Sequence, residues 1–505
     1  MKLSLRFILL LGILTGMIGC SQTPALPTST AIPTSTNVIP TATEIQPLAT
    51  AAAGLEAEPG APGVGDSLYP LLGNGGYDVQ HYTLDITVNN VLRGELEGTT
   101  TIEARATQDL SSFNLDFIRF DIEVVRVKGQ PAEFRQTPHE LTVTPSEPLM
   151  ENEPFTVEVQ YQGSPETIRG SGFQVGWFTF EGGSFVFSEP NGAATFFPVN
   201  DHPLDKATYT FQVTVPDPYE VAANGVLTET IDQGETTTFV FEARDPMASY
   251  LATIGIDEFD VETSQSATGV PIRNYYPTGS PESINDPFER QPEMLDFYSE
   301  VFGAYPFEVY GAIVVDTEIG AALETQTLSI FGIEIADPNN LEEAEGVVAH
   351  ELAHQWFGNS VSVADWRDIW LNEGFATYAD GLWTEHTRGR EALDDWIREV
   401  YDAVSENRER MSPPGEPPAD SLFNPGVYYW GALTLHALRL EVGDDVFFEI
   451  LKTYHERYKG GSARTADFIA VAEEVSGKEL STFFDSWLYS EQLAPIPEMG
   501  LEASR

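Results

Sequence analysis

The spacing of apolar residues changes from a period of two to a period of three to four near residue 260, and this change constrains the fold most. Before it, segments such as "HYTLDITVNN" (81–90), "FTVEVQYQG" (155–163) and "ATYTFQVTVPD" (207–217) alternate apolar and polar residues. Such alternation, rich in β-branched and aromatic side chains, is typical of short strands with one buried face. We expect an N-terminal antiparallel all-β domain over residues 67–262.

The second half of the chain has helical spacing. In "LEEAEGVVAHELAHQWFGN" (341–359), "EGFATYADGLWTEHTRG" (373–389) and "ALDDWIREVYDAVSENRERM" (392–411), apolar residues recur every three or four positions. This pattern predicts amphipathic helices. We expect a mostly helical domain with a few strands over residues 263–505. Because 505 residues exceed what one hydrophobic core usually supports, the chain is predicted to be an α+β multidomain protein.

The N-terminus carries a targeting signal. In "MKLSLRFILLLGILTGMIGC" (1–20), Lys2 and Arg6 precede an apolar run too short to span a membrane as a stable helix. The segment resembles a bacterial lipoprotein signal peptide, with Cys20 as the lipidated residue. The alternatives are a plain secretory signal with an incidental cysteine and an uncleaved anchor. We expect an extracytoplasmic lipoprotein, anchored to a membrane through Cys20 on the cell surface or periplasmic side.

Residues 21–66 differ in composition from the rest of the chain. Threonine, serine, proline and alanine dominate, and charge is nearly absent before Glu44. Such a segment cannot bury enough apolar surface to offset the entropy of ordering. It is predicted to be a disordered stalk that holds the folded body away from the membrane.

The charge balance excludes one class of partner. The chain has 78 acidic and 26 basic residues, for a formal net charge of -52. A surface of this kind repels nucleic acid, so no nucleic-acid partner is expected. Solubility in a salty or exposed setting and attraction of cationic substrates both remain open as reasons for the acidity.

Two histidines stand four residues apart in "VVAHELAHQWFGNSV" (347–361). On a helix, positions i and i+4 share a face, so His350 and His354 can both direct a ring nitrogen at one metal ion. Glu351 lies beside that point without occupying it, where a carboxylate can act as general base toward water. The pattern predicts a zinc site in preference to a helix whose histidines only cap or pack.

A catalytic zinc site needs a third protein ligand and one open position. Glu373 in "WLNEGFATY" is the best third ligand, because a helix, a loop and an antiparallel return would bring it beside His350 and His354. The remaining histidines have no partner motif and are expected to be surface or packing residues: His81, His139, His202, His386, His436 and His455.

These residues resemble a known family. His350, Glu351, His354 and Glu373, with their flanking "WFGN" (356–359) and "LNEGFA" (371–376), are similar to the motifs of the gluzincin zinc aminopeptidases, whose members include aminopeptidase N and leukotriene-A4 hydrolase. The resemblance covers about residues 77–495. It implies a β domain followed by a thermolysin-like metallopeptidase domain, and one zinc ion per chain. Many relatives continue into a further helical domain, which we expect this chain to lack.

The resemblance also implies three more site residues. "AALETQT" (321–327) is similar to the family's exopeptidase motif and makes Glu324 the anchor for the substrate's α-amine, although Ala321 and Thr325 depart from that motif. Glu189 matches a second amine-binding residue. Tyr428 in "VYYWGALTLHAL" matches the phenol that stabilises the oxyanion. Physically, a protonated amine requires carboxylates, and a developing anion requires a hydrogen-bond donor.

We therefore expect an extracytoplasmic zinc aminopeptidase that acts on peptides with a free N-terminus. The nearest alternative is a zinc endopeptidase with the same catalytic centre, in which the departures at Ala321 and Thr325 leave Glu324 idle. An epoxide hydrolase and a non-catalytic binding module are more distant alternatives. A missing ligand would favour the binding module, and the sequence retains His350, His354, Glu373 and the base Glu351.

Overall fold

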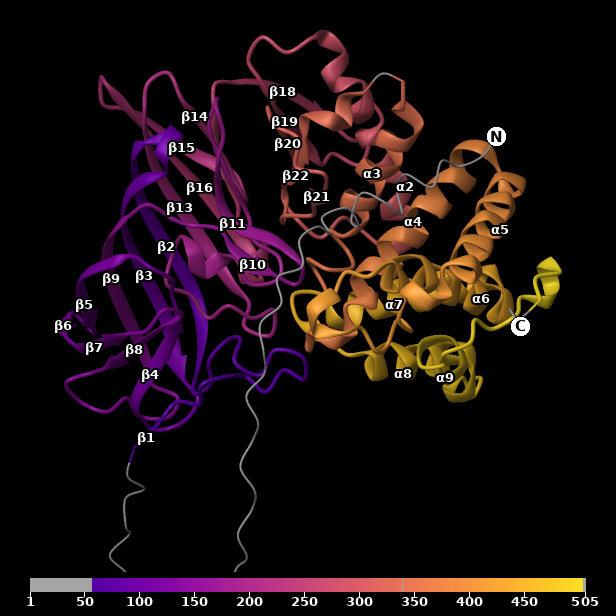
Figure 1. Cartoon of the computed structure of the whole chain (residues 1–505), viewed down its shortest axis with the longest axis horizontal. Helices are drawn as coiled ribbons and strands as arrows, with labels where there is room; N and C mark the ends of the chain where they lie inside the picture. Colours follow the sequence, from indigo (N-terminus) through magenta and orange to yellow (C-terminus); the bar gives the residue numbers. More distant parts are fainter. Residues whose placement is uncertain (1–56, 338, 503–505) are drawn as a thin grey trace, which may run out of the picture.

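The computed structural model describes residues 57–337 and 339–502, which form a β-rich body and a mostly helical body side by side (Figure 1). The predicted signal peptide, Cys20 and residues 21–56 of the predicted stalk lie outside the described residues. Within the described ranges, no helix has both the length and the apolar composition needed to cross a bilayer.

The largest element of the β body is an eight-stranded sheet. Alternation sets which face is buried, and β13 alternates buried and partly exposed residues along its whole length. Neighbouring strands are antiparallel except β2 and β13, which pair in parallel with Thr208 opposite His81. In spatial order the strands are β15 (Val226–Asp232), β16 (Thr236–Met247), β13 (Ala207–Pro216), β2 (Tyr77–Asn90), β3 (Glu95–Ala106), β9 (Pro154–Gly163), β5 (Asp121–Val127) and β6 (Gln130–Pro131).

Two smaller sheets complete this body. The four-stranded sheet contains, in order, β1 (Glu58–Pro59), β4 (Leu110–Asp116), β8 (Glu140–Thr144) and β7 (Glu133–Gln136). The five-stranded sheet contains β10 (Ile168–Gly170), β11 (Phe173–Thr179), β12 (Ser184–Phe187), β17 (Ile254–Asp257) and β14 (Glu220–Ala223). All four residues of β12 are buried, and its two phenylalanines, Phe185 and Phe187, belong to one hydrophobic cluster with Ile313 and Leu323 of the second body.

A mixed five-stranded sheet opens the second, mostly helical body. Its order is β18 (Phe259–Gln265), β19 (Pro271–Pro277), β20 (Tyr310–Val315), β22 (Ser329–Gly332) and β21 (Ala322–Leu323), with β21 at the edge. The domain boundary expected between residues 262 and 263 falls inside β18. The chain therefore passes from the β domain to the second body before Phe259. Alternation alone cannot tell which sheet a strand joins, and β18 pairs only with β19.

Eight α-helices, several short 3₁₀ and π-helical segments, and a two-stranded sheet of β23 (Ser362–Val363) with β24 (Ser462–Ala463) form the rest of the described helical body. Helix α4 lies at the centre, between α3 and α6. Gly374 of α4 and Gly431 of α6 allow the closest approach, because a Cβ on either would lie 2.9 Å from the other's Cα. The helices are α2 (Gln291–Phe302), α3 (Leu341–Ala353), α4 (Trp370–Arg388), α5 (Arg390–Glu406), α6 (Gly431–Val442), α7 (Asp444–Tyr458), α8 (Thr465–Ser476) and α9 (Ser481–Leu488).

Buried polar contacts join the two bodies. Lys206 donates hydrogen bonds to the carbonyl oxygens of Asn359 (2.7 Å) and Ser360 (3.1 Å), just beyond α3. Asp66 accepts hydrogen bonds from Trp366 N (2.7 Å) and from the ring of His202 (3.1 Å). Residues 57–66, which composition assigned to the stalk, are therefore part of the folded body. The Asp66 side chain finds partners that only the fold brings near.

Candidate active site

Helix α3 carries the two histidines of the motif. Ala344, Val348 and Leu352 recur every four residues and bury one face of the helix, and His350 and His354 lie on a neighbouring stripe. His354 caps the helix with φ −56° and ψ −24°, so helical spacing still holds there. The two imidazole ring centroids are 4.7 Å apart.

Glu373 reaches these rings from the first turn of α4. Its Oε2 lies 3.5 Å from Nε2 of His350 and 3.5 Å from Nε2 of His354. Glu373 is buried, as is nearly all of the first half of α4, so its position is set by the packing of α4 against α3 and α6. The structure thus brings together the three ligands predicted from the sequence.

The donor set fits zinc. Nδ1 of His354 donates to the carbonyl oxygen of Phe357 at 3.1 Å, which leaves Nε2 with a lone pair facing Glu373. Ligands bound at about 2.0–2.1 Å in a tetrahedron lie about 3.4 Å apart. The separations of 3.5 Å from Glu373 Oε2 to both rings match this value. Two imidazoles and a carboxylate are also a common set for catalytic zinc.

Asp380 supports the site, although the sequence patterns above did not single it out. Its Oδ2 lies 3.5 Å from Nδ1 of His350, on the side of the ring away from Glu373. A carboxylate in this position orients the imidazole and favours the tautomer whose Nε2 binds metal. The signal was available, because Asp380 follows Glu373 by seven positions, or two helical turns, and so shares its face of α4.

Glu324 and Glu189 approach Glu373 from two different domains. Glu324 follows the edge strand β21, and Glu189 follows β12 of the β domain. Carboxylate oxygens of the three residues lie within 4.8 Å of one another. Oε1 of Glu189 and Oε1 of Glu324 are buried and have no hydrogen-bond partner among the described residues. A buried carboxylate pair of this kind requires a cation or a proton.

The electrostatics of this cluster agree with that requirement. Burial raises the pKa of Glu189 well above its ordinary value, and the charges of Glu324 and Glu373 add to the effect. Burial also raises the pKa of Glu324, opposed chiefly by His354. The cluster therefore favours a ligand that brings positive charge.

Tyr428 lies beside His350. It belongs to a π-helical turn (Gly426–Trp430) immediately before α6, and its ring centroid is 6.1 Å from that of His350 with an interplanar angle of 20°. Burial and then the charge of Glu373 raise its pKa well above the ordinary value, so the phenol keeps its proton. Burial, with a further contribution from the charge of Asp380, raises the pKa of Tyr429. Tyr428, whose ring stacks on that of His350, is thus the tyrosine beside the metal ligands.

Glu351 lies inside the site. Burial raises its pKa to about 8, against the opposing charges of His350 and His354. Its Oε2 has no hydrogen-bond partner among the described residues. Ligand atoms of Glu351, Glu324 and His354 lie within 4.8 Å of one another, so the Glu351 carboxylate lies close to one of the histidines and to Glu324.

Known proteins are similar to this chain in sequence and in fold. Residues 78–251 match the Peptidase M1 N-terminal domain, and residues 287–487 match the Peptidase family M1 domain. The crystal structure of an M1 zinc metallopeptidase from Deinococcus radiodurans is similar, with a TM-score of 0.79 and 34% sequence identity, over 86% of this chain and 98% of that one. The chain belongs to peptidase family M1.

Membership of family M1 confirms the resemblance to the gluzincin aminopeptidases, the α+β fold and the expectation of zinc. Human glutamyl aminopeptidase is 29% identical over 319 residues, which are 59% of this chain and 33% of that protein. Aminopeptidase M1 of Arabidopsis thaliana is 27% identical over 314 residues, 59% of this chain and 36% of that protein. The part of this chain that matches thus spans about a third of the length of each of these two relatives.

Proposed function

We propose that this M1 protein is a zinc-dependent aminopeptidase that removes N-terminal residues from peptides. The observation that carries the proposal is the pair of buried carboxylates, Glu189 and Glu324, beside the metal ligand Glu373. A free α-amine is protonated at neutral pH and offers three donors to these oxygens. Charge-assisted hydrogen bonds to both glutamates would hold the first residue of the substrate next to the metal.

The other residues divide the chemistry between them. Zinc held by His350, His354 and Glu373 would polarise the scissile carbonyl and lower the pKa of water. Glu351 would take the proton of the attacking water and pass it to the leaving amine. Tyr428 keeps its proton and would donate a hydrogen bond to the oxyanion that forms from the carbonyl oxygen.

Relatives support peptides as substrates. A glutamate-to-alanine variant of the Deinococcus enzyme was crystallised with a Tyr-Ser-Ala substrate, at 34% identity to this chain and a TM-score of 0.78. Similar variants of a two-domain M1 zinc metallopeptidase hold L-tryptophan and L-arginine. By this likeness, the substrates of the present protein are peptides with a free N-terminus.

The test is to follow the products of an unblocked peptide by mass spectrometry over time. An aminopeptidase releases single residues in order from the N-terminus. Internal fragments as the first products would instead support the zinc endopeptidase. In that case Glu324 would have no role in binding, as the departures from the family motif at Ala321 and Thr325 would permit.

We also propose that the protein is a lipoprotein on the outer side of a membrane, anchored through Cys20. The support comes from the sequence alone. Two basic residues, Lys2 and Arg6, precede an apolar run, and a cysteine stands at the end of that run. Incorporation of labelled fatty acid by the wild-type chain and its loss in Cys20→Ser would agree with the proposal. Equal labelling of both chains would contradict it.

A further inference from the structure

The backbone turn that follows Glu324 is held in an uncommon conformation. Leu328 N donates to the carbonyl oxygen of Thr325 at 3.0 Å, which closes the turn, and Thr327 has φ +67°. A β-branched residue rarely adopts this left-handed conformation and does so where its surroundings fix it. The turn connects Glu324, which directly follows the edge strand β21, to β22, so its conformation sets where the Glu324 carboxylate lies.

Gln355, the residue after the zinc ligand His354, fixes the turn from one side. Its Oε1 accepts a hydrogen bond from Thr327 N at 2.8 Å, and its Nε2 donates to the carbonyl oxygen of Glu324 at 3.1 Å. The Gln355 side chain is fully buried. One amide side chain on the zinc-binding segment thus spans both ends of the turn.

Asn359 contributes to the same contact. Its Nδ2 donates to the carbonyl oxygen of Glu324 at 2.6 Å, and the side chain is fully buried. The Glu324 carbonyl oxygen therefore accepts two hydrogen bonds, both from the segment that continues α3. Neither contact involves the Glu324 carboxylate, which stays available to a ligand.

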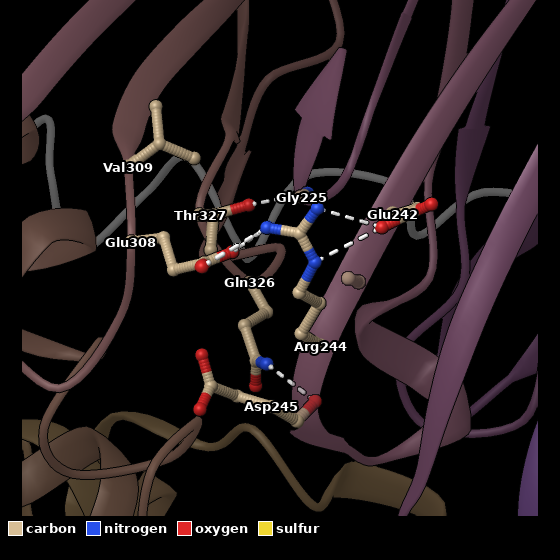
Figure 2. Close-up of a pocket in the computed structure, with 9 residues that line it drawn as sticks. Gly225, Glu242, Arg244, Asp245, Glu308, Val309, Gln326 and Thr327 are labelled. Carbon is tan, nitrogen blue, oxygen red and sulfur yellow. Dashed lines mark hydrogen bonds and ion pairs between the residues drawn. The ribbon is translucent and has the colours of Figure 1, made fainter. Parts of the chain in front are cut away.

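The β domain holds the opposite side of the turn. Gly225 N donates to Oγ1 of Thr327 at 2.8 Å, and Asn224 Nδ2 donates to the carbonyl oxygen of Gln326 at 2.7 Å. Figure 2 shows Thr327 joined to Gly225 and the Gln326 side chain pointing toward Asp245 of β16. The cavity there is about 10 Å³, room for one water molecule at most, so little free volume remains on this side of the turn.

We propose that Gln355 is a positioning residue for recognition of the substrate's N-terminal amine. Through the carbonyl oxygen of Glu324 and the N–H of Thr327, it fixes the Glu324 carboxylate relative to the zinc ligands. The inference rests on the proposed function, because it concerns how Glu324 meets the amine. Gln355 Nε2 also lies 3.5 Å from the carbonyl oxygen of Glu351, at the limit of a hydrogen bond, whereas its contacts with Thr327 N and the Glu324 carbonyl oxygen are short. We therefore expect its effect chiefly on substrate binding.

The test compares full-length wild type with Gln355→Met, which keeps the length of the side chain and removes both hydrogen bonds. KM for a short unblocked peptide should rise roughly tenfold, the size expected for losing buried hydrogen bonds, with kcat within about threefold and one zinc per chain. Gln291→Met is the matched control, because Gln291 is also a buried glutamine of this domain, bonded to Asn274 Nδ2 at 2.8 Å and outside the site. Its KM should stay within about twofold of wild type.

An unchanged KM in Gln355→Met would overturn the inference. So would a loss of kcat accompanied by loss of zinc, because Gln355 would then act through the metal helix. If Gln355→Met does not fold, Asn359→Ala removes one bond to the same carbonyl oxygen and should raise KM in the same direction, and an unchanged KM there overturns the inference. Wild type that cleaves unblocked and N-acetylated peptides equally would refute the proposed function itself, which separates the two failures.

Discussion

Glu189 of the β domain and Glu324 of the catalytic domain place carboxylate oxygens within 4.8 Å of each other, although 135 positions of sequence separate them. Their meeting depends on how the two domains dock, through contacts such as Lys206 with the carbonyl oxygen of Asn359. Two buried carboxylates repel unless they share a proton or a cation. In the proposed function the shared cation is the ammonium group of a peptide N-terminus.

Removing either charge should weaken substrate binding. Glu324→Gln and Glu189→Gln are each expected to lower kcat/KM for unblocked peptides about 10- to 100-fold, the size of a lost charge-assisted hydrogen bond. Steady-state kinetics on the two variants measures this. Glu300→Gln on the exposed face of α2 is the control and should stay within about twofold. Wild-type kcat/KM in Glu324→Gln would show that the carboxylate does not bind the amine.

The base can be separated from the metal site. Glu351→Gln should retain one zinc per chain, because Glu351 is not a ligand, and should lower kcat by about 10²- to 10⁴-fold. Zinc analysis together with kcat on the same preparation checks both halves. Turnover at the wild-type rate would mean that another group takes the proton.

The paired tyrosines provide a matched comparison. Tyr428→Phe removes the hydroxyl of the ring stacked on His350 and should lower kcat about 10²- to 10³-fold with little change in KM. Tyr429→Phe removes the hydroxyl of its neighbour in the chain and should change kcat by less than about threefold. The reverse order of effects would exchange the roles of the two residues.

The β domain should lose stability as pH rises. Burial raises the pKa of Glu140 to about 7, and burial followed by the charge of Glu140 raises the pKa of Asp116. Burial also raises the pKa of Asp205 to about 7. The folded state therefore binds protons more tightly than the unfolded chain, and the stability that these groups contribute is present below about pH 4 and is lost as pH rises toward 7.

Glu140→Gln tests this electrostatic prediction. The amide mimics the protonated acid, so the variant should melt roughly 2–4 °C above wild type at pH 8 and close to it at pH 4.5. Glu133→Gln, on the exposed strand β7, is the control and should follow wild type at both pH values. A Glu140→Gln melting temperature below wild type at pH 8 would contradict the assignment.

Local spacing is enough to predict much of the site. His350 and His354 are one helical turn apart, and Glu373 begins the next helix, so helical periodicity and chain order together indicate all three metal ligands. Periodicity could not identify Gln355, because its role depends on a turn 28 positions earlier in the chain that only the fold brings beside α3.

The same limit applies to the fold. Alternation predicted strands correctly, yet it could not show that β18 leaves the β domain, because sheet membership depends on long-range pairing with β19. Nor could it show that β2 and β13 pair in parallel. Composition placed residues 57–66 in the stalk. It could not show that Asp66 bonds to His202 and to the Trp366 N–H, because these partners approach Asp66 only in the folded chain.

Amine recognition is tested most simply with one short peptide in two forms, with a free N-terminus and with an N-acetyl group, assayed on the zinc-loaded full-length protein. We predict that acetylation lowers kcat/KM by at least about 100-fold, because the neutral amide cannot satisfy Glu189 and Glu324. Equal kcat/KM for the two forms would contradict the proposed role of the two glutamates and identify the protein as an endopeptidase that uses the same zinc centre.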